Sequence, residues 1–273
     1  MKLIAVSGST KCDWRIVDGE NIVASFYSNG LNPFFHSQEH VVEILEELEP
    51  LQKHRDPIKE VYIYSAGCGS KSLQKIVRNA VYEILPKAHV LVNHDIVASA
   101  LATYEGVSAI TCILGTGSNS CYFDGDIVRQ ETPALDYVLG DEGGGSYYGK
   151  QLLSAFLHGK LPPELHAAFK NEYDLTKEDI LERDYMQPYA NVYLASFMSF
   201  IQKYKEHDFM TTMVKEGMTL FMELFILPYH QYKSLKTHFT GSIAYYFEDI
   251  LCDVASGLHI NTGSIMKEPI EGL

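Results

Sequence analysis

The apolar positions near the start of the chain predict a β-hairpin. Residues 3–6 are apolar and predict a short buried strand, residues 7–10 (Ser-Gly-Ser-Thr) predict a turn, and residues 12–17 predict the returning strand. A turn without bulky side chains presents backbone N–H groups, which a polyphosphate needs if the backbone is to approach it closely. By itself, however, such a sequence is more typical of an ordinary turn that connects two strands.

A second copy of this pattern changes the interpretation. Residues 109–114 are apolar, residues 115–119 (Gly-Thr-Gly-Ser-Asn) form another small-residue turn, and residues 120–123 return. In both copies an Asp-Gly pair and a further apolar strand start follow, at Asp18-Gly19 and at Asp124-Gly125. Asp-Gly between apolar runs is a strong hairpin signal. Two phosphate loops of the hairpin type predict two related domains that face each other across a cleft.

The remaining periodicity predicts alternating helices and strands, followed by a helical region. The elements expected in the first half are helices over residues 37–51, 70–85 and 95–104, and strands over residues 60–66 and 90–92. In the second half, the glycine-rich residues 139–145 precede a helix over 146–157, a helical pattern from 163 to 225, a strand over 236–240 and a helix over 243–254. We therefore expect an α/β fold with covered sheets.

This layout also predicts the domain organisation. The first domain is expected over residues 1–107 and the second over residues 108–273, with a helical insertion at about 163–230. The last few residues are candidates for returning to the first domain.

Composition limits the class of protein. The chain has 273 residues, 46% of them hydrophobic, which fits a globular protein of one large or two medium domains. Its 22 basic and 35 acidic residues give a net charge of −13, which argues against binding nucleic acid or an anionic membrane. The five cysteines have no metal-ligand spacing and predict buried thiols in a reducing cytosol. No apolar run suits a signal peptide or a membrane span, so a cytoplasmic protein is expected.

Five motifs carry a resemblance to a known family. They are residues 7–11 (Ser-Gly-Ser-Thr-Lys), 31–35 (Leu-Asn-Pro-Phe-Phe), 115–119, 139–143 (Leu-Gly-Asp-Glu-Gly) and 241–244 (Gly-Ser-Ile-Ala). Through these motifs, in family order, the whole chain resembles the BadF/BadG-type ATPases of the N-acetylglucosamine kinase type, within the larger group of sugar kinases, actin and heat-shock chaperone ATPases. The resemblance implies two ribonuclease H-like (actin-like ATPase) domains around a nucleotide cleft. It also implies phosphorylation of an amino sugar by ATP with Mg²⁺, and a homodimer.

The resemblance further implies roles for individual residues. Asp95 matches the catalytic aspartate that takes the proton from the acceptor hydroxyl. The residues expected to bind ATP are Gly8, Ser9, Thr10, Lys11, Gly115, Thr116, Gly117, Gly241 and Ser242. Those expected to bind the sugar are Asn32, Ser118, Asn119 and Asp141.

Structural roles remain open for several of these residues from the sequence alone. Asp95 stands at a strand-to-helix junction, where the sequence alone favours an N-cap, a role that does not exclude the catalytic one. Asn32 precedes Pro33 and could form an Asx turn. Lys11 is also typical of a solvated surface lysine, and Asp141 of a charge at a helix N-terminus.

A position just before the first loop departs from the family pattern. The family's first loop usually has an acidic residue two positions before its first glycine, where it helps to hold Mg²⁺ through water. This chain has Val6 there. The first alternative to a kinase is therefore a non-catalytic nucleotide or sugar sensor, and the second is an ATPase that acts on a partner protein.

Overall fold

The computed structural model describes residues 1–273 and divides into two compact units. Unit 1 comprises Met1–Thr103 together with Pro269–Leu273, and unit 2 comprises Tyr104–Glu268. Each unit contains one five-stranded sheet. The sequence predicts the division after residue 107, and the units divide after residue 103.

The sheet of unit 1 begins with the predicted hairpin. Its strands, in the order β3-β2-β1-β4-β5, are β3 (Asn21–Asn29), β2 (Lys11–Asp18), β1 (Lys2–Ser7), β4 (Glu60–Ser65) and β5 (His89–His94). Strand β1 pairs antiparallel with β2 and parallel with β4, and β4 pairs parallel with β5. The carboxyl ends of β1, β4 and β5 therefore lie along one edge of the sheet.

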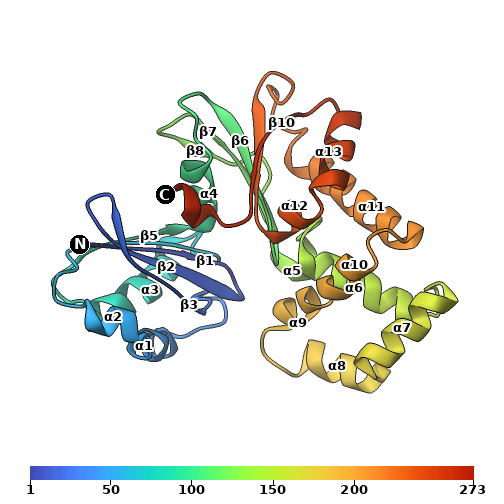
Figure 1. Cartoon of the computed structure of the whole chain (residues 1–273), viewed down its shortest axis with the longest axis horizontal. Coiled ribbons are helices and arrows are strands. Elements are labelled where there is room, and N and C mark those ends of the chain that lie inside the picture. Colours follow the sequence, from blue (N-terminus) through green and yellow to red (C-terminus); the bar gives the residue numbers. More distant parts are fainter. The chain divides into compact units, whose positions relative to one another are not determined.

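Helices cover both faces of this sheet (Figure 1). The face that carries Leu3, Ala5 and Ile63 packs on α1 (Gln38–Glu46), α2 (Glu49–Lys53) and α3 (Lys71–Ile84). The opposite face, which carries Val6 and Tyr64, packs on α4 (Asp95–Ala102) and on the C-terminal 3₁₀ helix η1 (Pro269–Gly272).

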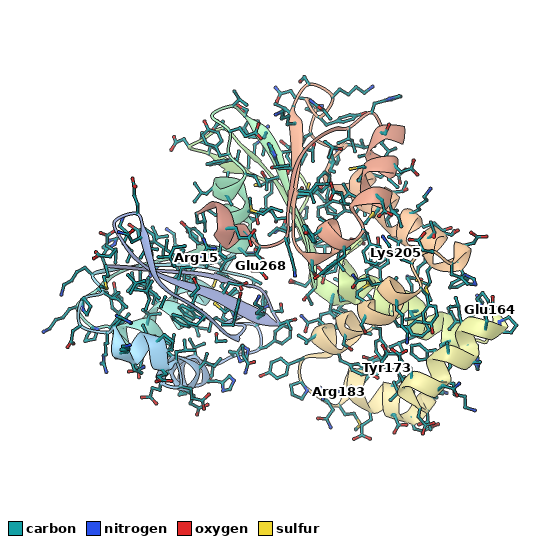
Figure 2. All side chains as sticks on the ribbon, viewed as in Figure 1. Arg15, Glu164, Tyr173, Arg183, Lys205 and Glu268 are labelled. Atoms are coloured by element: carbon teal, nitrogen blue, oxygen red, sulfur yellow. The ribbon has the colours of Figure 1, made fainter.

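Two side-chain contacts help to define the ends of unit 1's elements. Arg15 of β2 donates from Nη1 to the carbonyl oxygen of Ile270 at 2.7 Å, which ties η1 to the sheet (Figure 2). Ser37 caps α1 by accepting a hydrogen bond from the backbone N–H of His40. The expected single helix over residues 37–51 is two helices, because Pro50 is tolerated only in the first turn of a helix.

The sheet of unit 2 repeats the topology of unit 1. Its strands, in the order β8-β7-β6-β9-β10, are β8 (Val128–Arg129), β7 (Ser118–Phe123), β6 (Ala109–Leu114), β9 (Lys236–Thr240) and β10 (Asn261–Met266). The pairings are again antiparallel for the first three strands and parallel for the rest. The predicted repeat is thus confirmed, whereas β10 was not predicted, because its polar residues and Gly263 give no strand signal.

Helices occupy most of the chain between β8 and β9. They are α5 (Asp136–Leu139), α6 (Gly145–Leu157), α7 (Pro163–Tyr173), α8 (Lys177–Tyr185), α9 (Ala190–Ser196), α10 (Met198–Lys203) and α11 (Asp208–Phe225). The helical pattern predicted between residues 163 and 225 is thus interrupted at residues 174–176, 186–189, 197 and 204–207. After β9 come α12 (Ser242–Tyr246) and α13 (Glu248–Gly257), which together replace the single helix predicted there.

Two further features concern the helices and the cysteines of the whole chain. None of the helices combines the length and the apolar character that crossing a membrane requires. All five cysteines are free thiols, and four of them are buried, as expected from their apolar surroundings.

Candidate functional site

The first predicted phosphate loop is the tight turn between β1 and β2. Gly8 closes it by donating its backbone N–H to the carbonyl oxygen of Lys11 at 2.9 Å. Gly30 packs its backbone directly against the loop and donates its N–H to the carbonyl oxygen of Thr10 at 3.2 Å. A Cβ atom at residue 30 would lie only 2.3 Å from the carbonyl oxygen of Gly8. The position therefore requires glycine if the loop is to keep this shape.

Asn32 braces the same loop from the side. Its Nδ2 donates to Oγ of Ser9 at 2.9 Å, and its Oδ1 accepts the backbone N–H of Phe34 at 3.0 Å. The second contact is the Asx turn that the sequence left open. Asn32 is buried, and the neighbouring Ser7 Oγ accepts the N–H of Leu31 at 2.7 Å. The structure thus brings Asn32 to the first phosphate loop.

Asp95 lies on the same edge of the sheet, where β5 ends and α4 begins. The N-cap of α4 is His94, so the interpretation of Asp95 as the N-cap is wrong. The Asp95 carboxylate instead lies 3.4 Å from Nδ1 of His94, and its side chain is 19% exposed. The Asp95 carboxylate is therefore partly exposed at this edge of the sheet and makes no helix cap.

The two charged residues that follow the first loop interact with each other. Nζ of Lys11 lies 2.7 Å from Oδ1 of Asp13 and 3.9 Å from the centroid of the Tyr27 ring. The ammonium group is therefore held over β2 and β3 rather than being free in solvent.

Val6 ends the apolar part of β1 and packs into a small cluster. Its neighbours there are Tyr64 of β4, Ala98 of α4 and Ile270 of η1, and Val6 itself is 8% exposed. The position that is acidic in the resembling family is therefore part of the hydrophobic packing between the sheet and α4.

The second predicted phosphate loop lies between β6 and β7 and is held by the start of α6. The N–H of Gly115 donates to the carbonyl oxygen of Gly117 at 2.9 Å. The N–H groups of Gly145 and Ser146 donate to the carbonyl oxygens of Gly115 and Thr116 at 2.8 and 2.9 Å. The glycine-rich sequence before α6 thus serves to dock this helix on the loop.

Asp141 is the charged centre of this part of unit 2. Its Oδ1 accepts the N–H of Ser118 at 3.2 Å, and its Oδ2 accepts the hydroxyl of Ser146 at 3.0 Å. A Cβ atom at Gly117 would lie 2.6 Å from Oδ1, so only glycine allows this approach. Asp141 adopts a left-handed backbone conformation, with φ at 62°. Burial is the main cause that raises its pKa to about 6.

The side chains beside Asp141 have different environments. Oγ of Ser118 is buried and has no hydrogen-bond partner. By contrast, Oδ1 of Asn119 accepts from the N–H of Ser120 at 2.9 Å and from Nε2 of Gln130 at 2.6 Å. Ser146 and Gln130 were not predicted as site residues, because no local motif marks them.

Gly241 and Ser242 lie at the end of β9, next to the second loop. The N–H of Gly241 donates to the carbonyl oxygen of Met266 at 2.9 Å, and its φ is 105°. A Cβ atom there would lie 2.4 Å from the carbonyl oxygen of Leu114, which directly precedes Gly115. Ser242 is exposed and begins α12. Unit 2 therefore gathers residues 115–118, Asp141 and Gly241 at one edge of its sheet.

Several solved structures share this architecture. No protein-family model and no curated protein matches the chain. A putative N-acetylglucosamine kinase from Porphyromonas gingivalis is 34% identical, covers 100% of this chain and 96% of its own, and superposes with a TM-score of 0.92. Another from Chromobacterium violaceum is 16% identical, with coverages of 99% and 96% and a TM-score of 0.75.

A more distant structure is a ROK-family glucokinase from Streptomyces griseus, solved with glucose and AMPPNP. It is 16% identical, covers 97% of this chain and 93% of its own, and has a TM-score of 0.52. The two five-stranded sheets thus define a two-domain fold of the sugar kinase and actin-like ATPase class. Within that class, the chain belongs to the family of putative N-acetylglucosamine kinases that the Porphyromonas gingivalis protein represents.

Proposed function

We propose that this protein is an ATP-dependent kinase of an amino sugar such as N-acetylglucosamine. The observation that carries the proposal is the 34% identity, over the full chain, to the putative N-acetylglucosamine kinase from Porphyromonas gingivalis. The loop geometry supports it, because both predicted phosphate loops are tight turns of small residues held by backbone hydrogen bonds. Such turns can bind phosphate oxygens through their N–H groups.

Each candidate residue has a role in this proposal. Asp95 is the general base that accepts the proton of the sugar hydroxyl as the phosphoryl group is transferred. The ATP-binding residues are Gly8, Ser9, Thr10, Lys11, Gly115, Thr116, Gly117, Gly241 and Ser242. The sugar-binding residues are Asn32, Ser118, Asn119 and Asp141. The contact pattern favours Ser118 and Asp141 in particular, because the Ser118 hydroxyl is buried without a partner and the Asp141 carboxylate retains lone pairs for hydroxyl groups.

Finer assignments follow from the same resemblance. We infer that the two sheets belong to ribonuclease H-like domains of the BadF/BadG type, and that α7–α11 form an insertion in the second of them. The free, mostly buried thiols are consistent with action in the cytoplasm.

The residues at the first phosphate loop do not fit a Mg²⁺ ion bound directly by the protein. Val6 is apolar, and Asp13, its register partner on β2, lies 2.7 Å from the ammonium of Lys11. No group of three His, Cys, Asp or Glu side chains is arranged to hold a metal. We therefore propose that Mg²⁺ enters with ATP, bound to its phosphates, and we assign no step of the reaction to a metal held by Val6 or its neighbours.

Restoring a carboxylate at residue 6 tests whether the metal position has been lost. The Val6→Asp variant is expected to reach half-maximal rate at a several-fold lower Mg²⁺ concentration than the wild type. It is also expected to lose about 1–3 kcal/mol of unfolding free energy, because a polar group replaces an apolar one against Ala98 and Ile270. The Val6→Thr variant keeps the shape of valine and adds a neutral polar group, so it controls for polarity without a carboxylate. An unchanged Mg²⁺ requirement in the aspartate variant would show that the metal is positioned elsewhere.

The raised pKa of Asp141 predicts that sugar binding depends on pH. With a pKa of about 6, the carboxylate is mostly ionised at pH 7 and mostly protonated at pH 5. If only the ionised form accepts the sugar hydroxyls, affinity for N-acetylglucosamine falls about tenfold between pH 7 and pH 5. Calorimetric titrations across this range measure the change. Asp141→Asn is expected to bind weakly at every pH, and a wild-type affinity that does not vary with pH would contradict the assignment.

The same pKa shift has the opposite effect on the stability of the free protein. The folded-state pKa lies above the ordinary value of 3.8, so the folded protein holds the proton more tightly than the unfolded chain. The contribution of Asp141 to stability is therefore fully present below pH 3.8 and is lost as the pH rises through about 6. Urea denaturation of wild type and Asp141→Asn over this range separates the effect from sugar binding.

One experiment distinguishes the proposed kinase from the alternatives. The pure protein is titrated with ATP and Mg²⁺ and with a panel of hexosamines, and both the heat of binding and ADP release are followed. ADP release that depends on one sugar supports the kinase. Binding of ATP and sugar without turnover would identify a sensor, the alternative favoured by the apolar packing of Val6. ADP release without any sugar would identify an ATPase.

A further inference from the structure

Unit 1 contains a groove at the amino ends of its parallel strands. We propose that this groove is a second ligand site, which binds a small phosphorylated metabolite. It has a volume of about 640 Å³, which is in the range of small-molecule sites. One wall comes from the segment between α2 and β4, and the other from the segment between α3 and β5.

The groove is separate from the candidate catalytic residues of unit 1. Lys59 and Ala88, which line it, directly precede β4 and β5. Asp95 lies beyond the opposite end of β5, and each of these two strands is six residues long. Six residues of extended chain span about 20 Å. A small ligand in the groove therefore does not contact Asp95 or the first phosphate loop.

The charge of the groove is opposite to that of the whole protein. Arg55, Lys59 and Lys87 are exposed around it, and none of the three forms an ion pair. Nζ of Lys59 donates only to the backbone carbonyl oxygen of Asp56, at 3.3 Å. Asp56 is the single carboxylate among the lining residues. Three unpaired cations beside one carboxylate form a local positive site on a chain whose net charge is −13.

The groove is also preformed. Its floor includes Ile58 and Ile84, which are 3% and 5% exposed and belong to the core of unit 1. The two walls are joined because the N–H of His89 donates to the carbonyl oxygen of Lys59 at 2.8 Å. The N–H of Lys59 in turn donates to the carbonyl oxygen of Met1 at 3.0 Å. A ligand would thus meet a shape that is already ordered, which reduces the entropic cost of binding.

This combination of groups indicates the chemistry of the ligand. A guanidinium and two ammonium groups suit a phosphate, to which arginine can donate two parallel hydrogen bonds. The apolar floor suits the ring-shaped body that carries the phosphate. An extended acidic peptide fits less well, because its charges would spread over the apolar floor and Asp56. Sugar phosphates and nucleoside monophosphates both combine a phosphate with a ring. Binding of either ligand in the groove does not depend on the proposed kinase activity.

Protection of individual lysines from acylation tests the site directly. The full-length protein is treated briefly with acetic anhydride in the presence of N-acetylglucosamine 6-phosphate, AMP, inorganic phosphate or unphosphorylated N-acetylglucosamine, and modification is measured by mass spectrometry. Either phosphorylated metabolite is expected to protect Lys59 and Lys87, and the one that does so identifies the source of the phosphate. Lys71 and Lys75, exposed on α3 outside the groove, serve as internal controls and should stay reactive.

A single substitution keeps both reporter lysines and weakens the site. Arg55→Gln is expected to raise the ligand concentration for half-protection at Lys59 and Lys87 at least fivefold, whereas Lys71→Gln, with the same change in charge, should leave it unchanged.

Absence of protection by both metabolites would overturn the proposal. Equal protection by inorganic phosphate would overturn it as well, because the floor would then contribute nothing. A further sample with polyglutamate tests the acidic peptide, and protection by polyglutamate alone would overturn the proposal in favour of an acidic protein partner. Since the readout is local, failure here leaves the proposed kinase activity untouched.

Discussion

Replacing Asp95 by asparagine is expected to reduce sugar-dependent ADP release by about 100- to 10,000-fold, the range associated with the loss of a general base. The amide has the shape of the carboxylate but does not accept the proton. The N-cap of α4 is His94 and its side chain makes no capping bond, so Asp95→Asn removes no helix cap. Steady-state kinetics with N-acetylglucosamine measure the loss, which should fall on kcat rather than on KM.

Two controls make this prediction specific. Asp18→Asn changes an exposed aspartate at the end of β2 that is far from the first phosphate loop, and is expected to leave kcat within about twofold. Calorimetry should show that Asp95→Asn still binds both ATP and sugar. Wild-type turnover in the Asp95→Asn variant would exclude Asp95 as the base and would direct attention to other carboxylates.

Substituting Gly30 is expected to have the second largest effect, because it displaces the first phosphate loop. In Gly30→Ala the new methyl group would lie 2.3 Å from the carbonyl oxygen of Gly8 and 2.7 Å from that of Ser9. Both contacts are with backbone, so the loop itself must move. We expect KM for ATP to rise at least tenfold and the free energy of unfolding to fall by about 1–3 kcal/mol, as in other overpacked sites. Kinetics and urea denaturation measure the two effects.

Gly257→Ala is the matched control for this substitution. Gly257 is the last residue of α13, and a Cβ atom there would meet nothing within 4 Å. Its exchange for alanine is therefore expected to leave KM unchanged and stability equal or slightly higher. If Gly30→Ala behaved in the same way, the first loop would not depend on the close approach of Gly30, and its role in binding ATP would need another explanation.

The repeated β-motif was predictable from local sequence. Strand alternation and the small-residue turns have short-range causes, so both hairpins could be located before the structure was known. Strand β10 could not, because a polar segment with a glycine becomes a strand only when β9 offers it backbone partners. Pro50 marks the break between α1 and α2 in the sequence. The apolar periodicity on either side of Pro50 nevertheless predicted one continuous helix.

The candidate site likewise combines features that the sequence predicts with features that only the folded structure shows. The repeated small-residue turns pointed to both loops, and the resemblance to the BadF/BadG-type ATPases pointed to Asp95 and Asp141. That Asp95 is not an N-cap, however, depends on where α4 begins. The partners of Asp141 and Asn119, namely Ser146 and Gln130, come from α6 and from the segment after β8. No helix or strand periodicity relates either pair, because each forms only when the chain between its two residues turns back in the folded protein.

The sequence by itself determined the α/β class, the duplicated hairpin, the small-residue loops and the absence of an acidic residue at Val6, since each follows from local composition and short periodicities. The tertiary structure alone decided that Val6 packs against α4 and η1 and that burial raises the pKa of Asp141 to about 6. It also decided that three basic residues from two separate segments line one groove. Burial, desolvation and charge clustering depend on which distant segments meet, and that is a property of the folded chain.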